Sequence, residues 1–189
     1  MNIMNRLLFF AILLLQSAVQ AVVIDVGATQ FSHTFTQLSD TKTSQTFINL
    51  SLMANITKGE PKKLNFGWTM ISVSTAVETS TTSDKLTSLD MGPVIRWAID
   101  QRHLFVLTLA YGVYAKGKFD TLTTSETLTG TSLFAKIAVE PQVTETFNLG
   151  VSLNYYSPSY NKAVLSSVES NVSYKGMQLF PAISMAFHY

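Results

Sequence analysis

Apolar and polar residues alternate with a period of two along most of the chain. From Val22 onward, every second position is apolar over a series of short segments, and the intervening positions are small, polar or charged. Successive side chains of a β-strand point to opposite faces, so this alternation predicts strands and not helices. We expect eight strands, within residues 22–29, 48–56, 64–70, 89–100, 105–114, 133–142, 147–155 and 176–189.

The connections between these segments also alternate, in length. Three are short turns, at 58–62, 100–102 and 144–146. The other four are predicted to be longer loops rich in Ser and Thr, at 32–46, 75–88, 116–131 and 157–173. Eight strands joined by alternating short and long connections predict an all-β fold, an eight-stranded antiparallel up-and-down barrel.

The two faces of the predicted strands differ in charge. One face is apolar and carries no charged residue, whereas the other holds most of the strand glycines. The charges on this second face are Asp25, Asp90, Arg96, Asp100, Lys136 and Glu140. A soluble, lipocalin-like barrel would need more charge on its exterior than this. Only 13% of the chain is charged, against about 25% in ordinary soluble domains. We therefore expect the apolar face to contact lipid and the charged face to line the lumen.

The first residues have the pattern of an export signal. A positive start at Met1–Arg6 precedes an apolar run at 7–15 and a stretch of small and polar residues at 17–21. The run is too short to cross the membrane as a helix. We predict a signal peptide over residues 1–21 and a barrel domain over 22–189.

Aromatic residues gather near both ends of the predicted strands, as in the two interfacial girdles of membrane barrels. Phe47 and Tyr156 are expected in the outer girdle with other aromatic residues. The membrane-interface aromatics that we predict are Trp68, Trp97, Tyr111, Tyr155, Phe187 and Tyr189.

The segment 179–189 alternates apolar residues and ends on an aromatic one, Tyr189. With the eight strands and the export signal, it resembles the small outer-membrane barrels of Gram-negative bacteria, the OmpA/OmpX/OmpW type. The resemblance implies location in the bacterial outer membrane, contact with its lipids and lipopolysaccharide, and recognition of the last strand by the outer-membrane insertion machinery. Pro93, Pro141 and Pro181 depart from the strand pattern, and we expect bulges or an altered registration there.

The candidate chemistry lies in the predicted lumen. Charges inside a barrel must pair, so we predict a network of Asp25, Asp90, Arg96, Lys136 and Glu140. Such a network is either a gate or a salt-bridged core, and we favour the core because narrow barrels are filled by side chains. His33 is the candidate base of a lipid-modifying enzyme, but no nucleophile and orienting acid can be assigned to it. No two histidines have metal-ligand spacing, and the chain has no cysteine.

These observations favour an outer-membrane protein that is not an enzyme, with a structural or surface-interaction role and a side-chain-filled lumen. A narrow, OmpW-like pore for small or apolar solutes is the alternative, and a lipid-modifying enzyme is a more distant one. We expect no cofactor and no metal. The net charge of +1 gives no field for nucleic acid. The sequence does not identify an extracellular ligand for the loops.

Overall fold

The computed structural model describes residues 22–35, 41–56, 63–79, 81–100 and 102–189. The predicted signal peptide, 1–21, lies outside the described residues and stays a prediction. Within the described ranges, no helix has the length and hydropathy needed to cross a membrane.

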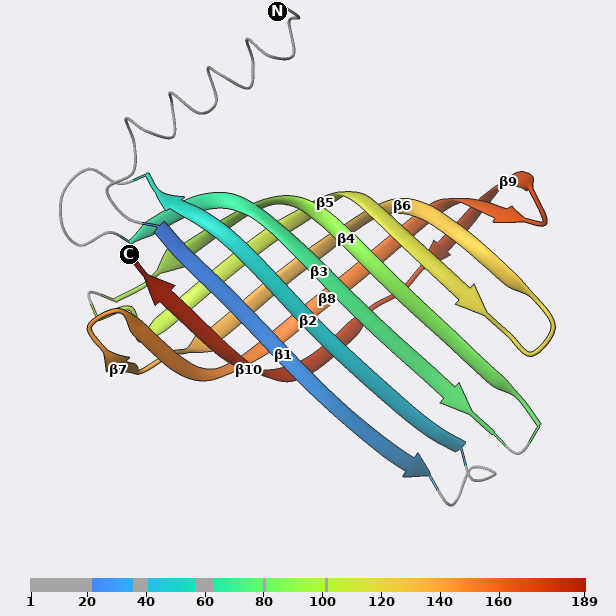
Figure 1. Ribbon diagram of the computed structural model, residues 1–189, viewed down its shortest axis with the longest axis horizontal. Coiled ribbons are helices and arrows are strands. Elements are labelled where there is room, and N and C mark those ends of the chain that lie inside the picture. Colours follow the sequence, from blue (N-terminus) through green and yellow to red (C-terminus); the bar gives the residue numbers. More distant parts are fainter. Residues whose placement is uncertain (1–21, 36–40, 57–62, 80, 101) are drawn as a thin grey trace, which may run out of the picture.

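The described chain is built from antiparallel strands (Figure 1). They are β1 (Val22–Phe35), β2 (Thr41–Asn55), β3 (Leu64–Glu78), β4 (Ser83–Ala98), β5 (Phe105–Asp120), β6 (Ser125–Val139), β7 (Gln142–Thr144), β8 (Phe147–Leu165), β9 (Val168–Lys175) and β10 (Gln178–His188). Eight of them form a closed ring in the order β1, β2, β3, β4, β5, β6, β8 and β10, because β10 pairs with both β8 and β1. The short strands β7 and β9 pair with β8. The prediction of an eight-stranded antiparallel up-and-down barrel is confirmed.

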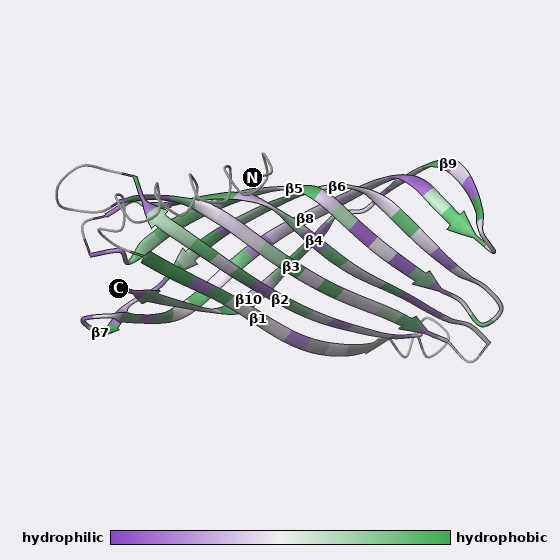
Figure 2. Cartoon of the chain, turned by 45° about the horizontal axis from the view of Figure 1, so that its top comes forward, coloured by the Kyte–Doolittle hydropathy of each residue, from purple (hydrophilic) through white to green (hydrophobic). Residues whose placement is uncertain are grey.

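Both faces of the strands follow the predicted alternation (Figure 2). Outward apolar side chains such as Leu52, Ile137 and Val151 are 59%, 61% and 65% exposed, while the residues between them are buried. The outward apolar positions form a belt around the ring, and such a belt on the outside of a closed barrel is typical of contact with lipid. The end with the short turns holds Val22 and the C-terminus, and the other end carries the outer hairpins and β9 (Figure 1).

The predicted long outer loops are wrong, because the strands continue through most of them. β3 and β4 are joined by a tight turn between Thr79 and Thr82, and β5 and β6 by one between Thr121 and Thr124. In each turn the hydroxyl of the first threonine accepts a hydrogen bond from the amide of the last, at 2.9 and 3.0 Å. The threonine side chain closes each hairpin with this bond, so a tight turn occurs where a long loop was predicted.

A β-bulge in β5 changes which residues face inward. The pairing of β5 shifts register against β4 between Met91 and Val94, and against β6 between Gly112 and Ala115. Val113 and Tyr114 consequently both point outward, and beyond them the odd-numbered residues, beginning with Ala115, point inward. The alternation of the segment 105–114 predicts Tyr114 on the same face as Thr108, Ala110 and Gly112, the lumen face. That prediction is wrong, since a bulge inserts one residue and reverses the alternation after it.

The three prolines have separate explanations. Pro93 lies on β4 beside this bulge. Pro141 lies two residues beyond Val139, the last residue of β6, so the strand ends before it. Pro181 pairs with Leu153 of β8, but the β1–β10 ladder ends at Ile183, so no partner on β1 needs the missing amide.

Candidate functional site

Four buried charged side chains meet inside the half of the barrel nearer the chain ends. The Lys136 ammonium of β6 lies 2.6 Å from a carboxylate oxygen of Asp25 on β1. The Arg96 guanidinium of β4 lies 2.7 Å from Glu140. Two weaker contacts link these pairs, Lys136 to Glu140 at 3.3 Å and Arg96 to Asp25 at 3.5 Å. All four side chains have 0% exposure, so they form one ion cluster, named so below, with two charges of each sign.

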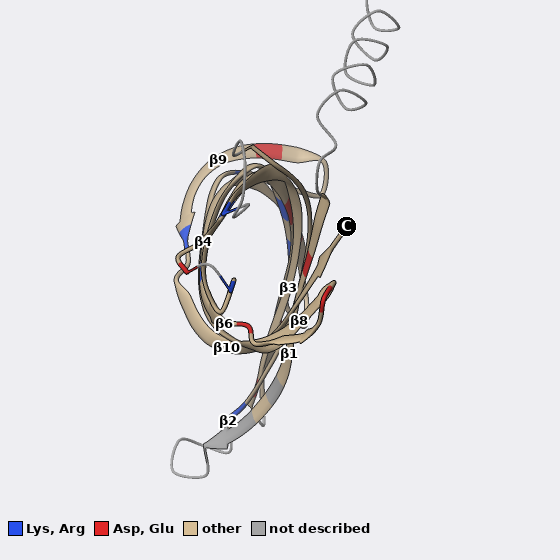
Figure 3. Cartoon of the chain, turned by 90° about the vertical axis from the view of Figure 1, so that its left-hand side faces the viewer, with Lys and Arg blue, Asp and Glu red and all other residues tan. Residues whose placement is uncertain are grey.

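Hydrogen bonds hold this cluster in place. The Ser184 hydroxyl of β10 donates to Glu140 at 2.6 Å and accepts a bond from Lys136 at 3.0 Å. The Asn148 amide donates to the main-chain oxygen of Glu140 at 2.8 Å. Asp25, Arg96 and Lys136 come from β1, β4 and β6, and Ser184 comes from β10. The contacts therefore cross the lumen and tie strands that are not neighbours. Figure 3 looks along the ring from the end with the C-terminus and shows where the charged residues lie on it.

Asp90 does not belong to this cluster, although the sequence predicted it there. It lies nearer the outer end of the lumen, where the Tyr156 hydroxyl and the Ser88 hydroxyl each donate to it at 2.6 Å. Tyr156 was expected in the outer aromatic girdle, but its side chain is only 1% exposed and points inward. It points inward because it lies one residue past the outward Tyr155, and a strand alternates its faces.

Buried polar side chains lie at one level of three adjacent strands, at the ion cluster. Arg96 pairs in register with Asn65 of β3 and with Thr108 of β5. Arg96 Nη1, Asn65 Nδ2 and Thr108 Oγ1 are buried and have no hydrogen-bond partner among the described residues. Buried polar groups of this kind normally bind ordered water, so we expect this level of the lumen to be hydrated.

An aromatic layer covers the ion cluster on its outer side. Phe47 stacks on Phe134 with ring centroids 5.7 Å apart, and Phe180 packs against Phe47 at 4.7 Å. All three are at most 1% exposed, and Ile71 and Val94 belong to the same buried group. The outer-girdle position expected for Phe47 is therefore wrong. The signal was available in the sequence, since each phenylalanine lies between two outward residues of its strand.

The six predicted interface aromatics lie on the outside of the barrel. Trp68, Trp97, Tyr111 and Tyr189 are about half exposed or more, and Tyr155 and Phe187 are partly exposed. Phe187 stacks on Phe147 at 4.8 Å. Among them, Tyr111 and Tyr155 lie toward the outer end and the other four toward the end with the chain termini.

The histidines form no recognisable catalytic or metal centre in the part of the chain that is described. The His33 side chain lies outside that part. His103 and His188 lie edge to face, with ring centroids 5.3 Å apart. No group of three or more His, Cys, Asp or Glu residues suited to a metal ion occurs among the described residues.

Asp100, predicted on the lumen face, lies in the turn after β4. Its carboxylate accepts hydrogen bonds from the amides of Arg102 and Phe105 at 2.9 and 2.8 Å. Burial raises the pKa of Asp100, but the backbone amides outweigh it and hold that pKa below its ordinary value. Asp100 is thus a turn-capping residue and does not extend the ion cluster.

Comparisons with known proteins give distant likenesses only. No family model matches the chain, and no curated protein matches it. Two solved structures share similarity at low identity. The translocator domain of autotransporter NalP from Neisseria meningitidis has a TM-score of 0.44 and 13% identity, covering 96% of this chain and 66% of that domain. Neisserial surface protein A has a TM-score of 0.43 and 16% identity, covering 88% of this chain and 95% of that one.

The class of the protein therefore follows from its own architecture. A ring of strands without free edges satisfies its backbone hydrogen bonds internally, as a membrane-spanning sheet must. The apolar belt, the aromatic residues near both of its edges and the polar lumen match transmembrane barrels of the outer-membrane type. The chain is an integral outer-membrane β-barrel protein.

Proposed function

We propose that this protein is a non-enzymatic component of the outer membrane whose lumen is closed to ions and small solutes. Its role is then structural, or depends on interactions of its surface. The observation that supports the proposal most directly is the ion cluster, whose four charges are fully buried and paired across the lumen. A conducting path would have to separate these pairs and expose them to moving ions.

The aromatic layer supports the same conclusion. Phe47, Phe134 and Phe180 pack ring against ring just outside the cluster. Water at the level of Arg96 would therefore meet an apolar barrier before the outer mouth. Ions cross such a barrier only at a large desolvation cost.

Planar bilayer conductance tests the proposal. The mature barrel is expected to give no steps above the lipid background. Arg96→Ala is expected to lower stability and still not conduct, because the aromatic layer remains. Arg102→Ala, in an exposed turn, is the matched control. Conductance in the unmodified protein would contradict a closed lumen and favour the narrow pore, and conductance only in Arg96→Ala would identify the cluster as a gate.

The proposal includes partners in the membrane. The outer ends of the strands present Tyr111 and Tyr155 at the edge of the belt and the exposed Lys116 and Lys118 beyond it. This order of aromatic and cationic groups suits the phosphorylated head groups of lipopolysaccharide. The insertion machinery would recognise β10 and the terminal Tyr189. Removal of the Tyr189 ring is expected to reduce the amount of assembled barrel in isolated outer membranes, measured as the gel band that shifts when the sample is boiled.

The absence of enzymatic activity can be tested separately. His33→Ala is expected to leave the lipid composition of the outer membrane unchanged, as measured by mass spectrometry of extracted lipids. A change in acylation or head-group modification, in a variant that still assembles, would contradict this part of the proposal and favour the lipid-modifying enzyme.

A further inference from the structure

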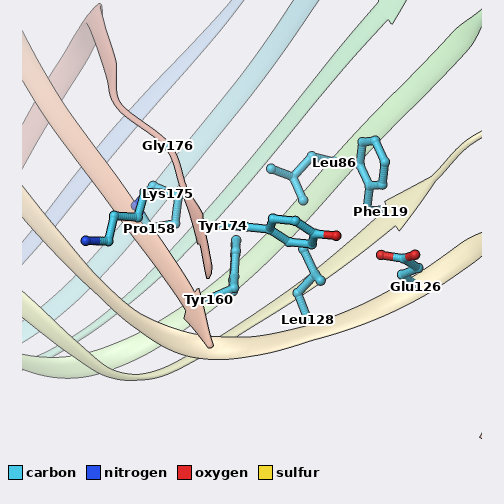
Figure 4. A pocket seen from close by; sticks show the side chains of 9 residues that line it. All are labelled: Leu86, Phe119, Glu126, Leu128, Pro158, Tyr160, Tyr174, Lys175 and Gly176. Atoms are coloured by element: carbon cyan, nitrogen blue, oxygen red, sulfur yellow. The ribbon is translucent and has the colours of Figure 1, made fainter. Parts of the chain in front are cut away.

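A cavity opens inside the outer mouth of the barrel, beyond the aromatic layer. Its volume is about 370 Å³, within the range of roughly 300–1,000 Å³ that is usual for small-molecule sites. Figure 4 shows its lining. The side chains come from β4, β5, β6, β8 and β9 and from the residue after β9: Leu86, Phe119, Glu126, Leu128, Pro158, Tyr160, Tyr174, Lys175 and Gly176.

The wall of the cavity is apolar because of the bulge in β5. After the bulge, Ala115, Gly117 and Phe119 point inward, while Lys116 and Lys118 point outward. If the same residues alternated without a bulge, the two lysines would face the cavity. Gly117 also gives room to Tyr160, since a Cβ at Gly117 would lie 2.9 Å from Tyr160 Cζ. Ala115, Leu128 and Tyr160 form a buried apolar cluster, and Leu86 and Phe119 pack against it.

Two charged side chains line the cavity, at opposite ends of it. Lys175 lies beside Pro158 and Gly176, whereas Glu126 lies on the far side, near Phe119 (Figure 4). Lys175 is exposed and has no ion-pair partner among the described residues. By contrast, Lys118 and Lys162 of the neighbouring strands pair with Asp120 and Glu169.

We propose that this cavity binds a single-chain amphiphile with an anionic head group. The alkyl chain lies among Leu86, Phe119 and Leu128, where burial of apolar surface provides most of the affinity. The head group lies next to the exposed Lys175 ammonium, at the end of the cavity away from Glu126. The ligand enters from the outside medium and not from the membrane, because the lining residues of β4, β5 and β6 lie beyond the last outward apolar residues of those strands: Leu89, Tyr114 and Leu133.

This inference goes beyond the closed lumen and is independent of it. The cavity lies outside the aromatic layer, so a ligand can bind there without passing through the barrel. A conductance result that contradicts the closed lumen would leave binding at the mouth untouched, and failure of binding would leave the conductance result untouched.

The test is an NMR titration of the whole mature barrel in lipid nanodiscs with decanoate. Saturable shifts are expected for the amides of Leu86, Phe119, Leu128 and Gly176. Leu86→Trp, which fills the cavity, is expected to weaken binding at least tenfold. Leu153→Trp, a matched change on the lipid face of β8, is expected to leave it unchanged. Shifts that do not saturate, or that survive Leu86→Trp at full strength, would overturn the site.

The head-group assignment has its own test. Decyltrimethylammonium, with the same chain length and opposite charge, is expected to bind several-fold more weakly than decanoate. Lys175→Gln is expected to remove that preference, and Lys42→Gln, on the outer part of β2, to keep it. Equal binding of both probes to the unmodified protein would overturn the role of Lys175. Contacts between the cavity residues and the nanodisc acyl chains, seen without any added probe, would overturn entry from the outside.

Discussion

The inner and outer halves of the lumen share strands β4 and β6 in their lining but have opposite chemistry. The inner half holds four fully buried charges in mutual contact, whereas the outer mouth holds leucine, phenylalanine and tyrosine around an open cavity. The ion pairs of the outer extensions lie on exposed side chains: Lys118–Asp120 at 2.8 Å and Lys162–Glu169 at 2.6 Å. Similar ion pairs are therefore buried in one half of the barrel and exposed to water in the other.

The different chemistry of the two halves of the lumen follows from where each half lies relative to the membrane. Within the belt, the outer face must be apolar, so the polar residues of each strand fall on the inner face. Beyond the belt, water surrounds the strands, so their outer face can be polar and their inner face can be apolar. The bulge in β5 lies at Val113 and Tyr114, next to the outer edge of the belt, and there the inward residues change from even-numbered to odd-numbered positions. One inserted residue thus exchanges the chemistry of the two faces.

Arg96→Ala is expected to have the largest effect, because it leaves Glu140 and Asp25 with less positive charge in a buried site. Breaking a buried ion pair from one side costs about 3–5 kcal/mol. Urea unfolding of the folded barrel in detergent, followed as the unboiled gel band, measures this loss. The matched variant Lys118→Ala breaks an exposed pair and should cost at most about 1 kcal/mol. Equal losses in both variants would contradict the division into buried and exposed halves.

Phe134→Ala is expected to cost about 3 kcal/mol, because it removes a buried ring that packs against Phe47. The same unfolding measurement applies. Phe66→Ala is the control, since the Phe66 ring is half exposed on the outside of the barrel. Its loss should be clearly smaller. A larger effect for Phe66 than for Phe134 would show that the aromatic layer is not an important part of the core.

Deletion of Val113 is expected to remove the bulge and to keep the faces of β5 beyond it, because Gly112, Tyr114 and Ala115 then alternate regularly as inward, outward and inward residues. The chain has no cysteine, so single cysteines report the orientation. With the bulge present, Lys116→Cys should react with a water-soluble maleimide and Ala115→Cys should be protected. The same pattern is expected in the deletion, and an exchange of the two reactivities would mean that Val113 is not the inserted residue.

The bulge also marks where prediction from the sequence stops. Strict alternation was enough to predict the strands, the barrel and the inward position of Arg96, Lys136 and Glu140, because a period of two fixes the face of every residue in an uninterrupted strand. It failed at Tyr114, since nothing in the alternation announces an inserted residue. It also failed in the outer hairpins, where the turn-closing bonds of Thr79 and Thr121 come from residues that also occur in open loops.

The partners of each inner residue depend on the ring and not on any one strand. Asp25 and Lys136 are far apart in the chain and meet only because β1 and β6 face each other across the closed barrel. Asp90 has the same parity as Arg96 but lies nearer the outer end of β4, where Tyr156 reaches it. The odd or even position of a residue in its strand gives the face on which it lies. Its depth in the lumen and its neighbours follow only from the register of the strands in the closed barrel.

The smallest expected effect concerns Asp100, which belongs to neither half of the lumen and so measures the background of turn stability. Its carboxylate accepts two backbone hydrogen bonds, and its pKa lies below the ordinary value. A carboxyl group whose pKa is lowered on folding stabilises the fold above its unfolded pKa, about 3.9, and loses this contribution as the pH falls through the folded pKa. Asp100→Asn should lower the free energy of unfolding by about 1 kcal/mol at pH 7, as for one modest hydrogen bond. The difference from the unmodified protein should not grow at lower pH. Unfolding midpoints at pH 7 and pH 3, with Asp84→Asn as control, measure the difference. A loss as large as that of Arg96→Ala would mean that the short turns stabilise the barrel as much as its buried charges do.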